Sequence, residues 1–127
     1  PDGFGDAKFV EQATPAAATN VYYVSGFTTS GEMSEKAKKF IEAYKAKYKE
    51  EPSMFAALAY DSVYMAAEAA KGAKTSVDIK DNLAKLKDFD GVTGSITIDK
   101  DHNPVKTALM IGLKDGQVDT VETVKAE

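Results

Sequence analysis

The sequence predicts an α/β fold, and more narrowly one portion of a larger α/β protein. A compact run of β-branched and aromatic residues near the start predicts a strand, three helical patterns follow it, and an alternating pattern fills the last third of the chain. One strand followed by three helices cannot supply a sheet on which all of the helices pack. We therefore expect the remainder of that sheet to lie outside these 127 residues.

The first predicted elements are a loop, a short helix and a strand. Residues 1–6 form a Pro-Asp-Gly-Phe-Gly-Asp run, which predicts a tight, exposed loop because proline fixes φ and glycine permits conformations closed to other residues. A short helical pattern through Phe9 and Ala13 follows and ends at Pro15. The run Val21–Val24 predicts a buried strand.

Two long helices are predicted next. The first begins after the N-cap Ser34 and ends at Pro52. Its apolar face comprises Ala37, Phe40, Ile41, Tyr44 and Tyr48. The second helix covers Met54–Lys71 and is capped by Ser53. Because this second helix is apolar nearly all round, we expect it to be buried on several sides.

A third helix and a set of strands complete the prediction. The helix opens with the capping-box pattern Thr75-Ser76-Val77-Asp78, and its inner stripe comprises Ile79, Leu83 and Leu86. Beyond Gly91 the pattern alternates and predicts a C-terminal β meander. Its parts are a strand Ser95–Ile98, a turn 99–104, a strand Thr107–Leu113, a type I′ hairpin at Asp115-Gly116 and a weaker strand Val118–Val124.

The composition is that of a globular chain and excludes several kinds of site. Apolar residues make up 43% and charged residues 28%, and the net charge of −4 disfavours a nucleic-acid partner. The chain has no cysteine, so disulfides, thiolate metal sites and a cysteine nucleophile are excluded. No run of eighteen apolar residues is present that would predict a membrane span.

Catalysis and metal binding are also disfavoured. The single histidine, His102, lies in a predicted turn, where no rigid partner would orient it as a general base. The same turn begins like a calcium loop at Asp99, but Met110 stands where that loop needs a bidentate glutamate. We therefore expect no enzyme activity, no cofactor and no metal.

Two residues do fit a binding function. Asp2 lies in the glycine-rich loop, and Phe55 lies in the first turn of the second long helix. A carboxylate can accept hydrogen bonds from the α-ammonium group of an amino acid, and an aromatic ring can pack against an apolar ligand side chain. The competing interpretation of Phe55 is an ordinary core position, because aromatic residues at helical spacing commonly pack inward.

The opening loop and the order of the later motifs resemble the periplasmic binding proteins for branched-chain amino acids, the receptors of ABC importers. The later motifs are Phe40-Ile41-x-x-Tyr44-x-x-x-Tyr48, Phe55 with Ala59-Tyr60-Asp61-Ser62-Val63, Gly91-Val92-Thr93-Gly94-Ser95-Ile96-x-Ile98-Asp99, and Lys114-Asp115-Gly116. The resemblance covers essentially the whole chain, which matches the carboxyl-terminal part of such a receptor.

The resemblance implies a type I periplasmic binding protein, in which two three-layer αβα lobes enclose a cleft. Residues 1–27 and 107–127 would belong to the second lobe and residues 30–106 to the first, with crossings near Phe27–Ser30 and Thr107. The acidic residue that pairs with the ligand ammonium would be Asp2, helped by the backbone of Gly3. Many relatives carry glutamate at this position.

The same resemblance places Phe55 on the wall of the side-chain pocket. It implies a small amino acid and the permease subunits of the importer as partners, and a location outside the cytoplasm, either periplasmic or anchored to the cell surface as a lipoprotein. A competing hypothesis is the same fold sensing an amide, an aromatic acid or another amino acid. A helical interaction module that uses the lysine-rich stretch Ser34–Glu50 is a second hypothesis, and an enzyme on a truncated α/β domain is a third.

The isolated chain is expected to self-associate and to bind no amino acid tightly. Its helices carry apolar faces that need a sheet, and we expect Val21–Val24 and Thr107–Leu113 to be open strand edges. Exchange of elements between identical chains would cover such surfaces.

Overall fold

The computed structural model describes residues 2–125, and it describes residues 2, 3 and 7 by their backbone only. The helices are η1 (Asp2–Gly5, a 3-10 turn), α1 (Ala7–Ala13), α2 (Glu35–Tyr48), α3 (Met54–Ala70) and α4 (Ser76–Leu83). The strands are β1 (Val21–Ser25), β2 (Phe89–Gly91), β3 (Gly94–Ile98), β4 (Pro104–Val105), β5 (Ala108–Lys114) and β6 (Gln117–Val124).

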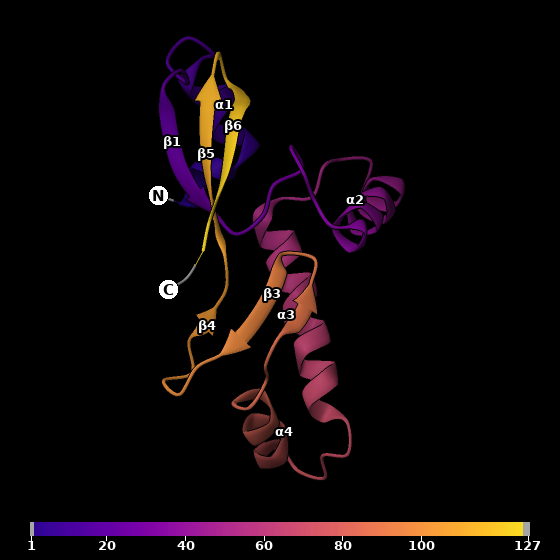
Figure 1. Ribbon diagram of the computed structural model, residues 1–127. Coiled ribbons are helices and arrows are strands. Elements are labelled where there is room, and N and C mark those ends of the chain that lie inside the picture. Colours follow the sequence, from indigo (N-terminus) through magenta and orange to yellow (C-terminus); the bar gives the residue numbers. More distant parts are fainter. Residues whose placement is uncertain (1, 126–127) are drawn as a thin grey trace.

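The strands form two separate antiparallel sheets, which belong to two bodies of the molecule (Figure 1). The first sheet has the order β1-β5-β6, and Tyr23 pairs with Ile111 in it. The second has the order β2-β3-β4. The three predicted strands of the second half of the chain are present as β3, β5 and β6, with β2 and β4 in addition, but these strands are divided between two sheets.

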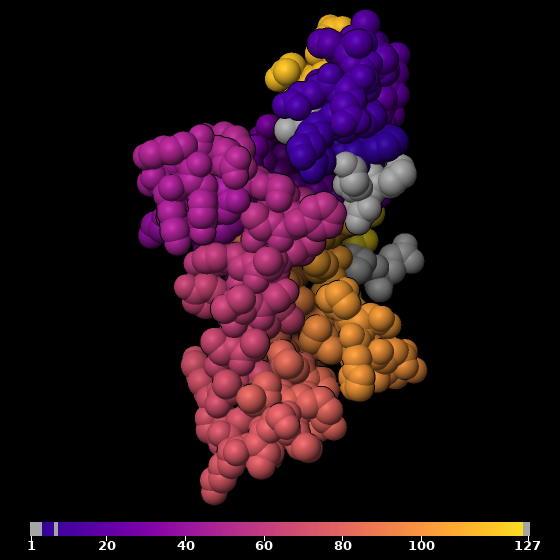
Figure 2. Space-filling model, turned by 180° about the vertical axis from the view of Figure 1, so that it is seen from behind, coloured from indigo at the N-terminus to yellow at the C-terminus, as the bar shows by residue number. Residues whose placement is uncertain are grey.

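Each body has its own hydrophobic core. In the strand body, the buried residues are Ala18, Tyr23, Ile111 and Leu113. In the helical body, they are Phe27, Ala37, Phe40, Ile41, Met54, Ala57 and Val92. Seen from behind in Figure 2, the N-terminal segment lies at one end of the molecule and α4 at the other, with α2 and α3 between them.

The start of every long helix is fixed by a side-chain cap that the sequence predicts. Ser34 accepts a hydrogen bond from the Ala37 amide, and Ser53 accepts one from the Ala56 amide. Thr75 and Asp78 form the reciprocal capping box of α4. The hairpin at residues 115–116 is confirmed too, because both residues have positive φ, as a type I′ turn requires.

The helix ends differ from the prediction. The helix α2 does not reach Pro52, because Lys49 adopts a left-handed conformation with φ 64° and closes the last turn. The helix α4 ends at Leu83, so Leu86 lies beyond it, and its carbonyl accepts a hydrogen bond from the Ile98 amide. Leu86 is therefore hydrogen-bonded to strand β3 and does not belong to the apolar face of α4.

Three expectations about exposure are wrong for the described chain. The strand β1 is buried on one face only, because Tyr22 and Val24 on the other face are 62% and 49% exposed. The strand β5 is not an edge, since it lies between β1 and β6, which form the two edges. The helix α3 is not buried on several sides, because no described element covers the side that carries Val63, which is 67% exposed.

Candidate functional site

A small cavity lies where the two bodies meet. It measures about 130 Å³. Its wall comes from η1, β1, the segment after β1, the start of α3 and the strand pair β5-β6. The lining residues are Gly5, Tyr23, Ser25, Phe27, Thr28, Thr29, Ser30, Pro52, Ser53, Met54, Ile111 and Val118. The opening loop and the start of α3, which the sequence places far apart, therefore reach the same cavity.

The opening loop is held on the strand body by aromatic packing. The rings of Phe4 and Phe9 stack with their centroids 4.4 Å apart, and both pack against the core of that body. Gly5 lies against Tyr23, because a Cβ atom at Gly5 would come within 3.3 Å of the Tyr23 ring. These contacts fix the backbone of η1 beside the cavity.

The start of α3 is held to the end of β1 by hydrogen bonds to sulfur. The Gly26 amide donates to Met54 Sδ at 3.2 Å, and the Ser25 hydroxyl lies 3.2 Å from the same atom and 2.6 Å from the Phe27 carbonyl oxygen. Ser25 is 2% exposed. The first turn of α3 is thus anchored at the junction of the two bodies.

The predicted binding residues are close in the sequence to two residues that line this cavity, Gly5 and Met54. Asp2 and Gly3 belong to η1, and the side chain of Asp2 lies outside the described residues. Phe55 directly follows Met54, which lines the cavity. Phe55 is 55% exposed as a residue, and it belongs to neither hydrophobic core of the described chain.

A buried polar cluster in the helical body was not predicted. Asp61 is 2% exposed, and its carboxylate accepts hydrogen bonds from the Val92 amide at 2.7 Å, the Thr93 amide at 2.9 Å and the Thr93 hydroxyl at 2.7 Å. Lys106 donates to Thr93 Oγ1 at 2.7 Å. The sequence offered one signal for this cluster, which is the position of Asp61 within the apolar helix α3. A buried charge in such a helix requires hydrogen-bond or charge partners.

Lys106 lies in the segment that joins β4 to β5. Its ammonium also donates to the Gly26 carbonyl oxygen at 3.3 Å. Partial burial lowers the pKa of Lys106 below its usual value, and the negative charge of Asp61 acts in the opposite direction. The ammonium group therefore lies among residues from three segments of the chain.

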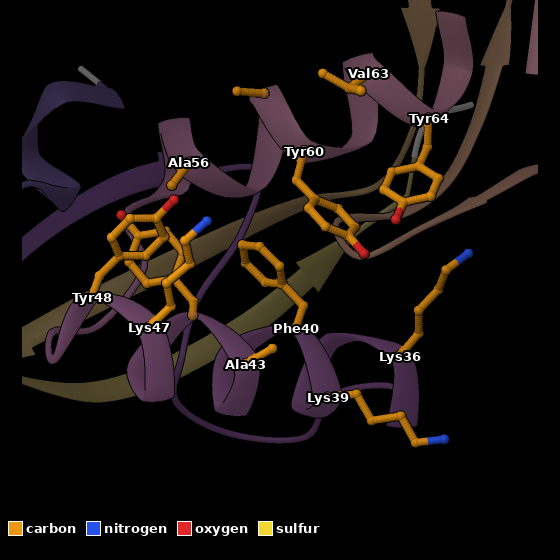
Figure 3. A pocket seen from close by; sticks show the side chains of 12 residues that line it. Lys36, Lys39, Phe40, Ala43, Lys47, Tyr48, Ala56, Tyr60, Val63 and Tyr64 are labelled. Carbon is orange, nitrogen blue, oxygen red and sulfur yellow. The ribbon is translucent and has the colours of Figure 1, made fainter. Parts of the chain in front are cut away.

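A second hollow lies on the outer side of the helical body, between α2 and α3 (Figure 3). It is an open groove of about 660 Å³. Aromatic and small side chains form its floor, and lysines of α2 form its rim. The lining residues are Lys36, Lys39, Phe40, Ala43, Tyr44, Lys47, Tyr48, Ala56, Ala59, Tyr60, Val63 and Tyr64. This groove is the exposed apolar side of the two helices.

His102 and the acidic side chains of the described residues are the remaining candidates for a catalytic or metal-binding role. His102 adopts a positive φ of 66° in the exposed turn before β4, as the sequence predicts a turn there. No group of three or more histidine, aspartate or glutamate side chains in the described part of the chain has metal-binding geometry. No helix within the same residues is both long and apolar enough to cross a membrane.

Comparison with known proteins identifies the family. The profile described as "Periplasmic binding protein" matches residues 3–117. The search of curated proteins found no match to the chain. Among solved structures, the chain is similar to the branched-chain amino acid transporter substrate-binding protein LivJ from Streptococcus pneumoniae, solved with isoleucine, at 60% identity and a TM-score of 0.90.

Two further structures share the fold. One is the leucine-binding protein LivK from Thermotoga maritima, with 27% identity and a TM-score of 0.86. The other is a solute-binding protein from R. palustris in complex with benzoate, with 21% identity and a TM-score of 0.71, over 93% of this chain and 34% of that one. LivJ and LivK are each matched over 98% of this chain and 36% of their own length, so the chain spans about a third of these structures. The chain belongs to the periplasmic binding protein family.

Proposed function

We propose that this chain is the carboxyl-terminal part of a receptor that binds a branched-chain amino acid outside the cytoplasm and delivers it to the permease of an ABC importer. The observation that carries this proposal is the 60% identity, over 98% of this chain, with the isoleucine-bound substrate-binding protein of Streptococcus pneumoniae. The family is one of binding proteins. We infer that the receptor performs no catalysis.

The receptor would work by closing two lobes on its ligand. Two separate cores and two separate sheets support a division close to the expected one, with residues 107–127 and the segment before Phe27 in one lobe and residues 30–106 in the other. Phe27 packs in the core of the helical body, so the first crossing would begin before this residue. The two bodies are joined by the segment between β1 and α2 and by the segment between β4 and β5. Rotation about a pair of links moves two lobes as rigid bodies, and a ligand that contacts both lobes favours the closed form.

Each lobe would contribute one ligand contact from this chain. Asp2, on the loop of the strand body, would accept hydrogen bonds from the ligand ammonium, with the Gly3 backbone beside it. Phe55, on the helical body, would pack against the apolar side chain of the ligand. Two findings support this assignment: the loop residue Gly5 and the residue before Phe55 line the same cavity, and Phe55 is exposed.

Calorimetry on the complete receptor tests the proposal. We expect binding of isoleucine, leucine and valine, and no comparable binding of benzoate or acetamide. Asp2→Asn should weaken binding by about 1.5–3 kcal/mol, which is roughly tenfold or more, because it removes a charge from a contact with an ammonium group. Glu11→Gln is the matched control, because Glu11 is an exposed carboxylate on α1.

Two results would contradict the proposal. Tight binding of benzoate or an amide, with none of the three aliphatic amino acids, would favour a different ligand class in the same fold. Wild-type affinity of the Asp2→Asn variant would remove Asp2 from the site.

A further inference from the structure

The two links between the bodies lie against each other. A Cβ atom at Gly26, just after β1, would lie 3.4 Å from Lys106 Nζ. The second link also lies close to the helical body, because a Cβ atom at Gly94 in β3 would lie 3.6 Å from Thr107 Oγ1. Both links also line a common cavity of about 160 Å³. In Figure 1 the two segments pass between the upper sheet and the lower body.

One side chain connects these links to the helical body. Lys106 belongs to the second link, Gly26 to the first, and Thr93 to the turn between β2 and β3. The Lys106 ammonium donates to the Gly26 carbonyl at 3.3 Å and to the Thr93 hydroxyl at 2.7 Å. A lysine ammonium has three donors and is a strong partner for oxygen acceptors in a partly buried position.

The acceptor on Thr93 is held in a fixed orientation. The Thr93 hydroxyl has one proton, and it donates that proton to Asp61 Oδ2 at 2.7 Å, so its lone pairs remain for Lys106. The turn itself is fixed to Asp61 by two further hydrogen bonds from its backbone amides. A Cβ atom at Gly91 would lie 2.5 Å from Asp61 Oδ2, so glycine is needed for this close approach.

The ammonium therefore bridges a rigid point on the helical body and the backbone of the opposite link. We propose that Lys106 is a positioning residue, which clamps the two links together and sets the orientation of the lobes on which ligand affinity depends. This inference rests on the proposed two-lobed receptor. Because Gly26 directly follows β1 of the strand body, a rotation of the lobes changes the distance between its carbonyl and Lys106.

The test uses the complete receptor with three variants. Lys106→Met keeps the length of the apolar stem and removes the ammonium, and Lys106→Arg restores a charged donor. Lys100→Met is the matched control, because Lys100 lies in the turn before β4, its side chain is 89% exposed, and it forms an ion pair with the neighbouring Asp101 at 3.5 Å. Small-angle scattering of the unliganded receptor, calorimetry with isoleucine and thermal melting are measured for each variant.

We expect Lys106→Met to increase the radius of gyration of the unliganded receptor and to weaken isoleucine binding by about tenfold, the effect of one hydrogen bond to a charged group. Lys106→Arg should recover most of both changes, and Lys100→Met should show neither. If Lys106→Met lowers the melting temperature but leaves the scattering and the affinity unchanged, Lys106 is only a structural residue and the proposal is wrong.

Two features keep the test decisive. The scattering comparison needs no ligand, so it tests the clamp even if the receptor binds none of the branched-chain amino acids. If Lys106→Met does not fold, Thr93→Val removes the oriented acceptor while the charge stays in place. Unchanged scattering of that variant would overturn the proposal, and an increase like that expected for Lys106→Met would support it.

Discussion

Replacement of Asp61 by asparagine should destabilise the helical body by about 2–4 kcal/mol. The carboxylate accepts three hydrogen bonds, one on Oδ1 and two on Oδ2. An asparagine has a single side-chain oxygen, so its NH₂ group must face at least one amide donor of the turn that contains Val92 and Thr93. A buried donor left without an acceptor costs about 1–3 kcal/mol, and the remaining hydrogen bonds lose the strengthening that a charged acceptor provides.

Urea unfolding of the complete receptor measures this loss. The matched control is Asp90→Asn, because the Asp90 side chain is 83% exposed and makes one surface ion pair with Lys36 at 3.3 Å. We expect the control to change stability by less than about 0.5 kcal/mol. A loss below about 1 kcal/mol for Asp61→Asn, with an unchanged denaturant slope, would show that the three hydrogen bonds do not hold the turn.

The remaining predictions concern the ligand wall, the apolar groove and one cap. Phe55→Ala should weaken binding of leucine more than of alanine, measured by calorimetry, and an unfolded variant would instead indicate that Phe55 is needed for stability. The isolated chain should self-associate in light scattering; Val63→Lys in the groove between α2 and α3 should reduce this association, whereas Val77→Lys, at an exposed position on α4, should not. Ser53→Ala should cost about 1 kcal/mol in urea unfolding, because it removes the N-cap of α3, and no change would refute that role.

The local part of the fold could be predicted from the sequence, because it depends on neighbouring residues. The caps Ser34, Ser53 and Thr75 and the Asp115-Gly116 turn follow from side-chain chemistry within four residues. The strand β2 was missed because it is three residues long, too short for an alternating pattern. The separation of two sheets was visible only through the resemblance, since no local pattern shows that β5 returns to β1.

The candidate site was predicted only in part for the same reason. A glycine-rich loop with Asp2 and an aromatic residue at the start of α3 are local signals. The cluster of Asp61, Thr93 and Lys106 joins segments that are far apart in the sequence. It can therefore be recognised only in the folded structure. The groove between α2 and α3 was not predicted either, because the apolar pattern of α3 suggested burial on several sides and could not show which side remains uncovered.

The sheet arrangement also implies an order of folding. The strand β1 pairs with β5, so Ser25 meets Leu109 only after the chain has passed through the whole helical body. Closing so long a loop in an unstructured chain is entropically costly, and long-range pairing of this kind slows folding. The helical body is continuous in sequence and has its own core, so its prior collapse would bring the ends of β1 and β5 together. During synthesis, the edge of β1 that pairs with β5 must therefore stay open until the ribosome has delivered β5.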